Sequence, residues 1–83
     1  MFLRARWDGS PPQIGEYLMA QQRPRFAYRI TDVEVRRIDK GTDRTFLGLH
    51  VERIDAKDVP PGAVRHPWKW DPHRKLGHAW SAA

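Results

Sequence analysis

The residues with the clearest chemical potential lie in one stretch, HPWKWDPHRKLGH, which runs from His66 to His78. It holds three His, two Trp, three basic residues and one Asp. Imidazole and carboxylate groups can bind metals, whereas Trp interleaved with Lys and Arg suits stacking on bases and neutralising phosphates. The stretch therefore suggests a metal site, a nucleic-acid-binding tail, or a segment that closes a small core.

A metal site in this stretch would draw on the side chains of His66, His73, His78 and Asp71. Six and then four residues separate the successive histidines, and two prolines interrupt any helix that would align them. These spacings match no common zinc motif. We therefore expect exposed histidines in a basic segment, with no metal and no cofactor.

The sequence offers little for catalysis. It has no Cys, and Ser10 and Ser81 lie in an expected turn and near the C-terminus, where a nucleophile is poorly preorganised. His50 and Glu52 share one face of an expected strand and could act as an acid–base pair. Charge pairing across strands, for instance with Arg36, explains them better. We predict that the protein is not an enzyme.

Nucleic-acid binding is the leading functional hypothesis. Residues 60–83 carry four basic residues against one Asp, residues 26–59 are neutral, and residues 1–25 carry a charge of +2. Basic ends attract polyanions. The expected ligand is single-stranded nucleic acid, bound weakly and with little sequence preference. The expected binding residues are Lys69, Trp70, Arg74, Lys75, Trp80, Arg23 and Arg25.

The same residues also fit a different class of function. Aromatic and Arg-rich surfaces are favoured at protein interfaces, so the alternative is a protein–protein interaction or assembly module with no nucleic-acid ligand. Salt separates the two hypotheses, because counterion release makes nucleic-acid affinity fall steeply as salt rises.

The N-terminal third of the chain contains one clear strand and one ambiguous segment. FLRARW alternates, with Leu3, Ala5 and Trp7 on one face, which predicts a strand that ends at the turn DGSPP. Residues 13–22 fit either a short helix after Ser10 or a strand, and we favour the strand EYLMA.

Two alternating runs predict a long hairpin. FAYRITDVEVRRI (26–38) and TFLGLHVERI (45–54) flank a loop that contains Gly41. The apolar residues of the first run change phase after Ile30, which predicts a β-bulge near Thr31–Asp32.

The pattern becomes irregular from Lys57 onward, where four prolines and two glycines occur in 27 residues. We therefore predict a small β domain over residues 1–59 and a Pro/Trp-rich basic segment over residues 60–83. Residues 66–70, with Trp68 buried, are expected to pack on the body, and residues 73–83 are expected to be mobile. The fold class is mainly β, a small, bent, bulged antiparallel sheet or partly open β-barrel with an irregular C-terminal strap.

Length and composition indicate one small domain of 83 residues with a net charge of +5. The absence of Cys excludes disulfides and fits a reducing cytoplasm. We see no signal peptide and no apolar run long enough to span a bilayer. We therefore expect a soluble, cytoplasmic bacterial protein with no membrane partner.

Four motifs resemble a group of small, uncharacterised bacterial and prophage-type proteins. They are W-D-G-x-P-P-x-x-G-x-Y-L (7–18), A-Y-R-I-x-x-V-x-x-R (27–36), E-R-I (52–54) and V-P-P-G-A-x-x-H-P-W-x-W-D (59–71). The resemblance implies no particular activity. At the level of the fold, the pattern is similar to small PUA/ASCH-like or SH3-like barrels, many of which bind RNA or DNA while others bind peptides.

Overall fold

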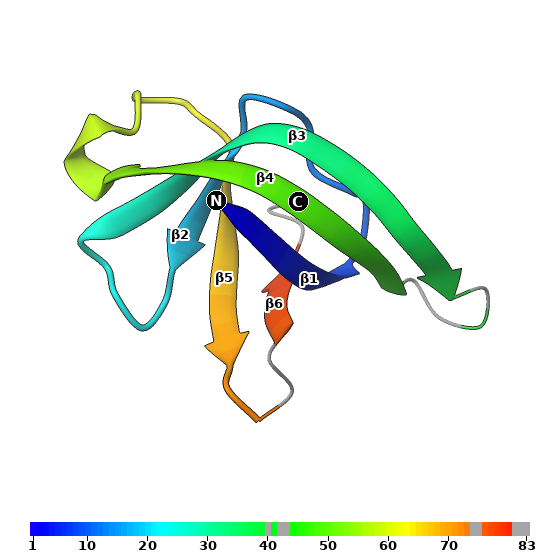
Figure 1. Ribbon diagram of the computed structural model, residues 1–83. Coiled ribbons are helices and arrows are strands. Elements are labelled where there is room, and N and C mark those ends of the chain that lie inside the picture. The colour runs from blue at the N-terminus through cyan, green and yellow to red at the C-terminus, as the bar shows by residue number, and fades with distance from the viewer. Residues whose placement is uncertain (40, 42–43, 74–75, 81–83) are drawn as a thin grey trace.

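The computed structural model describes residues 1–39, 41, 44–73 and 76–80, with residues 39 and 78–80 described by their backbone. The chain is mainly β, as predicted, and its strands form a closed six-stranded barrel in the order β1-β4-β3-β2-β5-β6 (Figure 1). The elements in chain order are β1 Phe2–Asp8, β2 Tyr17–Ala20, β3 Phe26–Asp39, β4 Arg44–Asp55, the 3₁₀ turn η1 Ala56–Asp58, β5 Arg65–Asp71 and β6 Leu76–Trp80.

The long hairpin and its bulge are both confirmed. β3 and β4 pair antiparallel from Phe26↔Asp55 to Asp39↔Arg44, and the register shifts between Ile30 and Asp32 as the change of phase predicts. A second shift follows between residues 35 and 37. Extra residues bend a strand and increase its twist, which lets the long β3–β4 ribbon curve around the barrel (Figure 1).

Residues 13–22 contain a strand, as we favoured, although this strand, β2, includes only Tyr17–Ala20. Tyr17, Leu18 and Met19 pair antiparallel with β3. The backbone at Gly15 has φ of 92°, a left-handed conformation that is easy for glycine alone. Gly15 N donates to Ile30 O at 2.8 Å, so this turn already docks on β3 before the strand begins.

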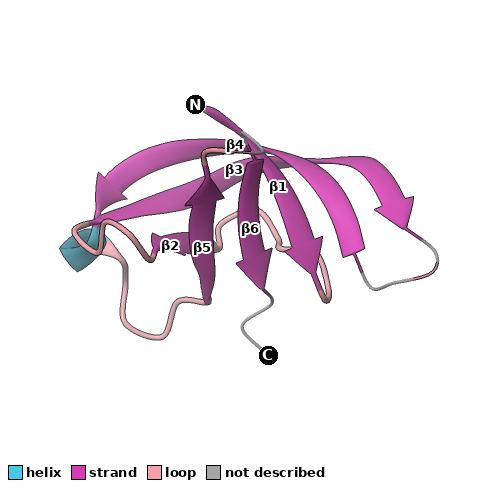
Figure 2. Ribbon diagram, turned by 90° about the horizontal axis from the view of Figure 1, so that it is seen from below, coloured by secondary structure: helices cyan, strands magenta, loops and turns pink. Residues whose placement is uncertain are grey.

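The C-terminal segment corrects the prediction of an irregular strap on a partly open sheet. β5 pairs parallel with β2, β6 pairs parallel with β1, and β5 and β6 pair antiparallel with each other (Figure 2). These three contacts close the barrel. Residues 76–80, which we expected in a mobile tail, therefore form a strand of its wall.

Pro67 is tolerated inside β5 because of where its backbone points. Trp68 O accepts a hydrogen bond from Gln21 N on the β2 side at 2.8 Å. Backbone groups of successive strand residues alternate in direction, so Pro67 faces the other side. There, β6 begins to pair only at Trp68, and the missing N–H of proline interrupts no ladder.

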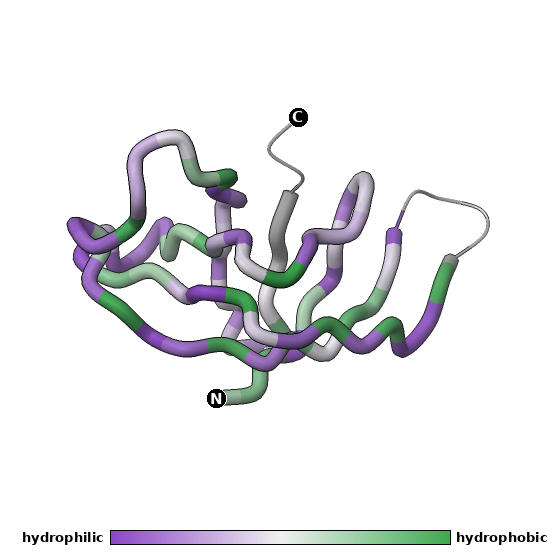
Figure 3. The backbone as a smooth tube through the Cα atoms, turned by 90° about the horizontal axis from the view of Figure 1, so that it is seen from above, coloured by the Kyte–Doolittle hydropathy of each residue, from purple (hydrophilic) through white to green (hydrophobic). Residues whose placement is uncertain are grey.

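The inward-facing side chains form a compact apolar core. Ala5, Trp7, Leu47 and Leu49 are buried, as the alternation of β1 and β4 predicts, and Trp68 is only 4% exposed. The tube in Figure 3 shows the alternation of polar and apolar residues along the strands. Among the described residues, no helix is long and apolar enough to cross a membrane.

Candidate nucleic-acid interface

The connection between β2 and β3 is fixed against the far end of β5 by a pair of hydrogen bonds. Trp70 N donates to Gln22 Oε1 at 3.1 Å, and Gln22 Nε2 donates to Trp70 O at 3.2 Å. The amide of Gln22 thus acts like one more strand residue beside β5. This contact brings the basic connection QRPR, residues 22–25, beside the C-terminal Trp-rich strand.

Trp70 lines two neighbouring hollows at this end of the barrel. The first has a volume of 380 Å³ and is lined by Ala20, Gln22, Arg23, Tyr28, Trp68, Trp70 and Pro72. The second has a volume of 410 Å³ and is lined by Gln22, Lys69, Trp70, Asp71, Pro72 and His73. We call the residues of both hollows the Trp70 surface.

The aromatic residues of the Trp70 surface differ in their accessibility. Trp70 is 39% exposed, Tyr28 is half-buried and Trp68 belongs to the core. A partly exposed indole that is packed against neighbouring residues can stack on a planar ligand, while these neighbours form the walls of the hollow. Trp70 is therefore the candidate stacking residue, and Trp68 supports the surface from below.

The cations of the Trp70 surface are available for an anion. Arg23 and Lys69 are exposed, and neither makes a side-chain hydrogen bond or ion pair within the described residues. The carboxylate of Asp71 is engaged at the turn after β5, where Oδ1 accepts from His73 N at 3.0 Å. Two cations thus flank one accessible indole.

Of the predicted nucleic-acid-binding residues, the structure brings Arg23, Lys69 and Trp70 together. Arg25 lines neither hollow and lies nearer η1, where its carbonyl accepts from Ala56 N at 2.8 Å. The predicted residues Arg74 and Lys75, and the side chain of Trp80, lie outside the described residues.

Sequence reasoning missed Gln22, Tyr28 and Pro72 as members of this surface. The glycine-free, proline-containing loop gave no sign that Gln22 would reach a strand 48 residues away. Tyr28 lies within the predicted strand 26–38, and its place at the barrel end follows only from the pairing of β3 with β2.

His66 corrects the expectation of exposed histidines in the C-terminal segment. It is 4% exposed, its Nε2 lies 2.8 Å from Glu16 Oε1, and its ring meets Trp7 edge-on with centroids 4.9 Å apart. This histidine is part of the barrel wall. His73 is exposed at the turn after β5, and the side chain of His78 lies outside the described residues.

The environment of Glu16 shifts its acidity. Burial raises the pKa of this carboxyl, but hydrogen bonds from the backbone N–H of Gln13 and from the His66 side chain, with the charge of His66, outweigh it and leave the pKa lowered. Glu16 is therefore held as a carboxylate in the folded protein.

The other candidate acid–base and metal ligands lie on the outer face of β3 and β4. Glu52 pairs with Arg29 at 2.8 Å, so the expected cross-strand charge pairing is present, with Arg29 rather than Arg36 as the partner. His50 Nε2 lies 3.5 Å from Glu34. Among the described residues, one group could hold a metal ion, because its potential ligand atoms lie within 4.8 Å of one another. It consists of Asp32, Glu34 and His50, which are exposed or half-exposed.

No protein-family model matches the chain, and comparisons with curated proteins and with solved structures gave no significant match. The resemblance to prophage-type proteins and to PUA/ASCH-like or SH3-like barrels therefore stays a prediction.

Proposed function

We propose that this protein is a non-enzymatic module that binds single-stranded nucleic acid through the Trp70 surface. The observation that carries the proposal is the placement of a partly exposed indole, Trp70, beside two exposed cations, Arg23 and Lys69, which have no side-chain partner in the part of the chain that the structure describes. The Gln22 hydrogen bonds hold the elements that carry them together. The net positive charge of the chain suits a polyanionic partner. The absence of Cys is compatible with a partner in the reducing cytoplasm.

The chemistry of this surface suits a base and its phosphates. Every base offers a flat face, and stacking on an aromatic side chain contributes about 1–3 kcal/mol for each base with little sequence preference. Lys and Arg add a salt-dependent attraction to phosphates. Because one indole and two cations make a small set of contacts, we expect weak binding.

Fluorescence anisotropy with a labelled oligothymidylate at low salt tests the proposal. If Arg23 and Lys69 each neutralise one phosphate, log affinity should fall against log salt with a slope of about −1.4. Trp70→Ala should weaken binding about tenfold without changing the slope, because stacking releases no counterions. Arg23→Gln should reduce the slope by about 0.7.

Arg65→Gln is the matched control. It removes the same charge from the opposite end of β5, where the guanidinium donates to Ala63 O and Pro60 O. It should leave the affinity and the salt slope close to those of the native chain. Absence of binding at tens of micromolar protein, or binding that salt does not weaken, would instead favour the protein-interaction alternative.

A further inference from the structure

A row of basic and aromatic residues crosses the outer face of the barrel at right angles to the strands. Strand pairing sets the order of its members, which is Lys69 on β5, Arg6 on β1, Phe46 on β4 and Arg37 on β3, with the backbone of β6 between Lys69 and Arg6. The residues before and after Arg6, Ala5 and Trp7, are both buried, so Arg6 and its β4 partner Phe46 face outward. Figure 2 shows β5, β6 and β1 side by side in this part of the wall.

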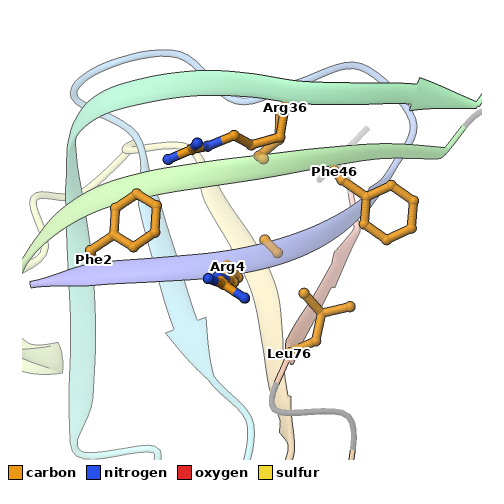
Figure 4. Close-up of a pocket in the computed structure, with 7 residues that line it drawn as sticks. Phe2, Arg4, Arg36, Phe46 and Leu76 are labelled. Atoms are coloured by element: carbon orange, nitrogen blue, oxygen red, sulfur yellow. The ribbon is translucent and has the colours of Figure 1, made fainter.

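A groove opens beside this row, over β1 and β4 (Figure 4). It has a volume of 270 Å³ and is lined by Phe2, Arg4, Ala5, Arg36, Phe46, Leu47 and Leu76. We call these residues the Phe2–Phe46 groove. Its lining joins two aromatic rings with two guanidinium groups and contains no carboxylate. Within the described residues Arg4 has no ion-pair partner, whereas Arg36 is paired with Glu34 at 2.9 Å.

The shape of the groove depends on Gly48, which lies between its walls. A Cβ atom at this position would come within 2.6 Å of Phe2 Cζ, so only glycine leaves room for the Phe2 ring to lie across β4. Arg37 covers the other ring, with its Cζ 4.3 Å from the centroid of Phe46. The two rings and their arginines are thus held in place by the sheet itself.

We propose that the strand bound at the Trp70 surface continues across β6 along this row and places a further base in the Phe2–Phe46 groove. This inference rests on the proposed function. Lys69 lines the Trp70 surface and begins the row, and Phe46 belongs to both the row and the groove, so the row connects the two surfaces. The cations Lys69, Arg6 and Arg37 lie on every second strand of the row. Cations at regular intervals suit the regularly spaced charges of a phosphate backbone better than the scattered charges of an acidic peptide.

The span of the row sets the length of strand that it binds. From β5 to β3 there are four strand spacings of about 4.8 Å, or about 19 Å in all. At about 3.4 Å for each stacked nucleotide, this distance takes about six nucleotides. An oligonucleotide of about four nucleotides should reach only the Trp70 surface, whereas one of about twelve should contact both.

The test compares these two lengths of labelled oligothymidylate by anisotropy. For the longer one, Phe46→Leu should weaken binding about tenfold through lost stacking, and Arg37→Gln should lower the salt slope by about 0.7. Both variants should bind the shorter oligonucleotide as the native chain does. Arg53→Gln is the matched control, because its guanidinium covers the Phe26 ring at 4.8 Å at the other end of the same hairpin.

Each result decides a different part of the proposal. If the native chain binds neither length, both the proposed function and this inference fail. If Trp70→Ala weakens binding while the Phe46 and Arg37 variants match Arg53→Gln at both lengths, the proposed function stands and the inference fails. Equally tight binding of a polyglutamate peptide at the groove, abolished by Arg37→Gln, would overturn the assignment to nucleic acid.

Discussion

His66 Nε2 lies 2.8 Å from Glu16 Oε1, in the wall of the barrel where the parallel strands β2 and β5 begin to pair. The two residues are 50 positions apart in the sequence, and the His66 side chain is 5% exposed. Parallel strands cannot be joined by a short turn, so side-chain contacts of this kind help to set their register. The pair therefore ties the C-terminal part of the chain to its N-terminal half.

Removing this pair should cost more stability than removing an exposed one. Glu16→Ala takes an acceptor from a buried ring nitrogen, and we expect a loss of about 1–3 kcal/mol in the free energy of unfolding. Glu52→Ala removes the exposed partner of Arg29 and should cost less than about 1 kcal/mol. Urea denaturation at neutral pH measures both, and equal losses would contradict a structural role for the Glu16–His66 pair.

The lowered pKa of Glu16 predicts how this contribution depends on pH. A carboxyl with a lower pKa in the folded state than in the unfolded state stabilises the folded protein when it is ionised. For Glu16 this contribution is complete above the unfolded pKa, near the ordinary value of 4.5. It is lost as the pH falls through the lower folded pKa. The stability difference between the native chain and Glu16→Gln should therefore be larger at about pH 6 than at about pH 3. A difference that stays constant or grows on acidification would contradict the assignment.

Trp68 and Gly77 form a second test of the closed barrel. The Trp68 ring lies over Gly77, where a Cβ atom would overlap it. We expect Trp68→Ala to cost about 3 kcal/mol or more through the cavity it leaves. Gly77→Ala should cost about 1–3 kcal/mol by overpacking.

The double variant distinguishes this contact from two independent defects. With alanine at position 68, the Cβ at position 77 has room, so the pair should cost about as much as Trp68→Ala alone. Chemical denaturation of the four proteins completes the cycle. Additive losses would show that the two residues do not meet, and a loss below about 0.5 kcal/mol for Trp68→Ala would place this residue outside the core.

Deleting residues 76–83 tests whether β6 is part of the barrel wall. The deletion removes the pairing of β6 with both β1 and β5, and it uncovers the core around Trp7 and Trp68. We expect the dispersed amide NMR spectrum and the near-UV circular dichroism of the complete chain to be lost. A truncated chain that retains both would support an irregular strap in place of a structural strand.

The sequence by itself determined the local parts of this fold. Period-two alternation identified β1 and the β3–β4 hairpin, and the change of phase after Ile30 located the bulge. These features depend on contacts between residues that are close in the chain or joined by one turn, so the pattern carries them directly. The burial of Trp68 was also predictable, because this residue belongs to an aromatic pair in a proline-containing segment of a small domain that has no disulfide.

Only the tertiary structure decided how the barrel closes and where its surfaces lie. The parallel pairings β2–β5 and β1–β6 join distant segments. β5 contains a proline and three charged residues in seven positions, and β6 is only five residues long and includes a glycine, so alternation does not reveal either strand. The contacts of Glu16 with His66 and of Gln22 with Trp70 depend on that closure, and Phe2 meets Gly48 through the pairing of β1 with β4. The type of a residue shows what chemistry its side chain can do. Closing the barrel costs chain entropy that only the sum of these distant contacts can offset. Which side chains meet is therefore decided by the fold as a whole.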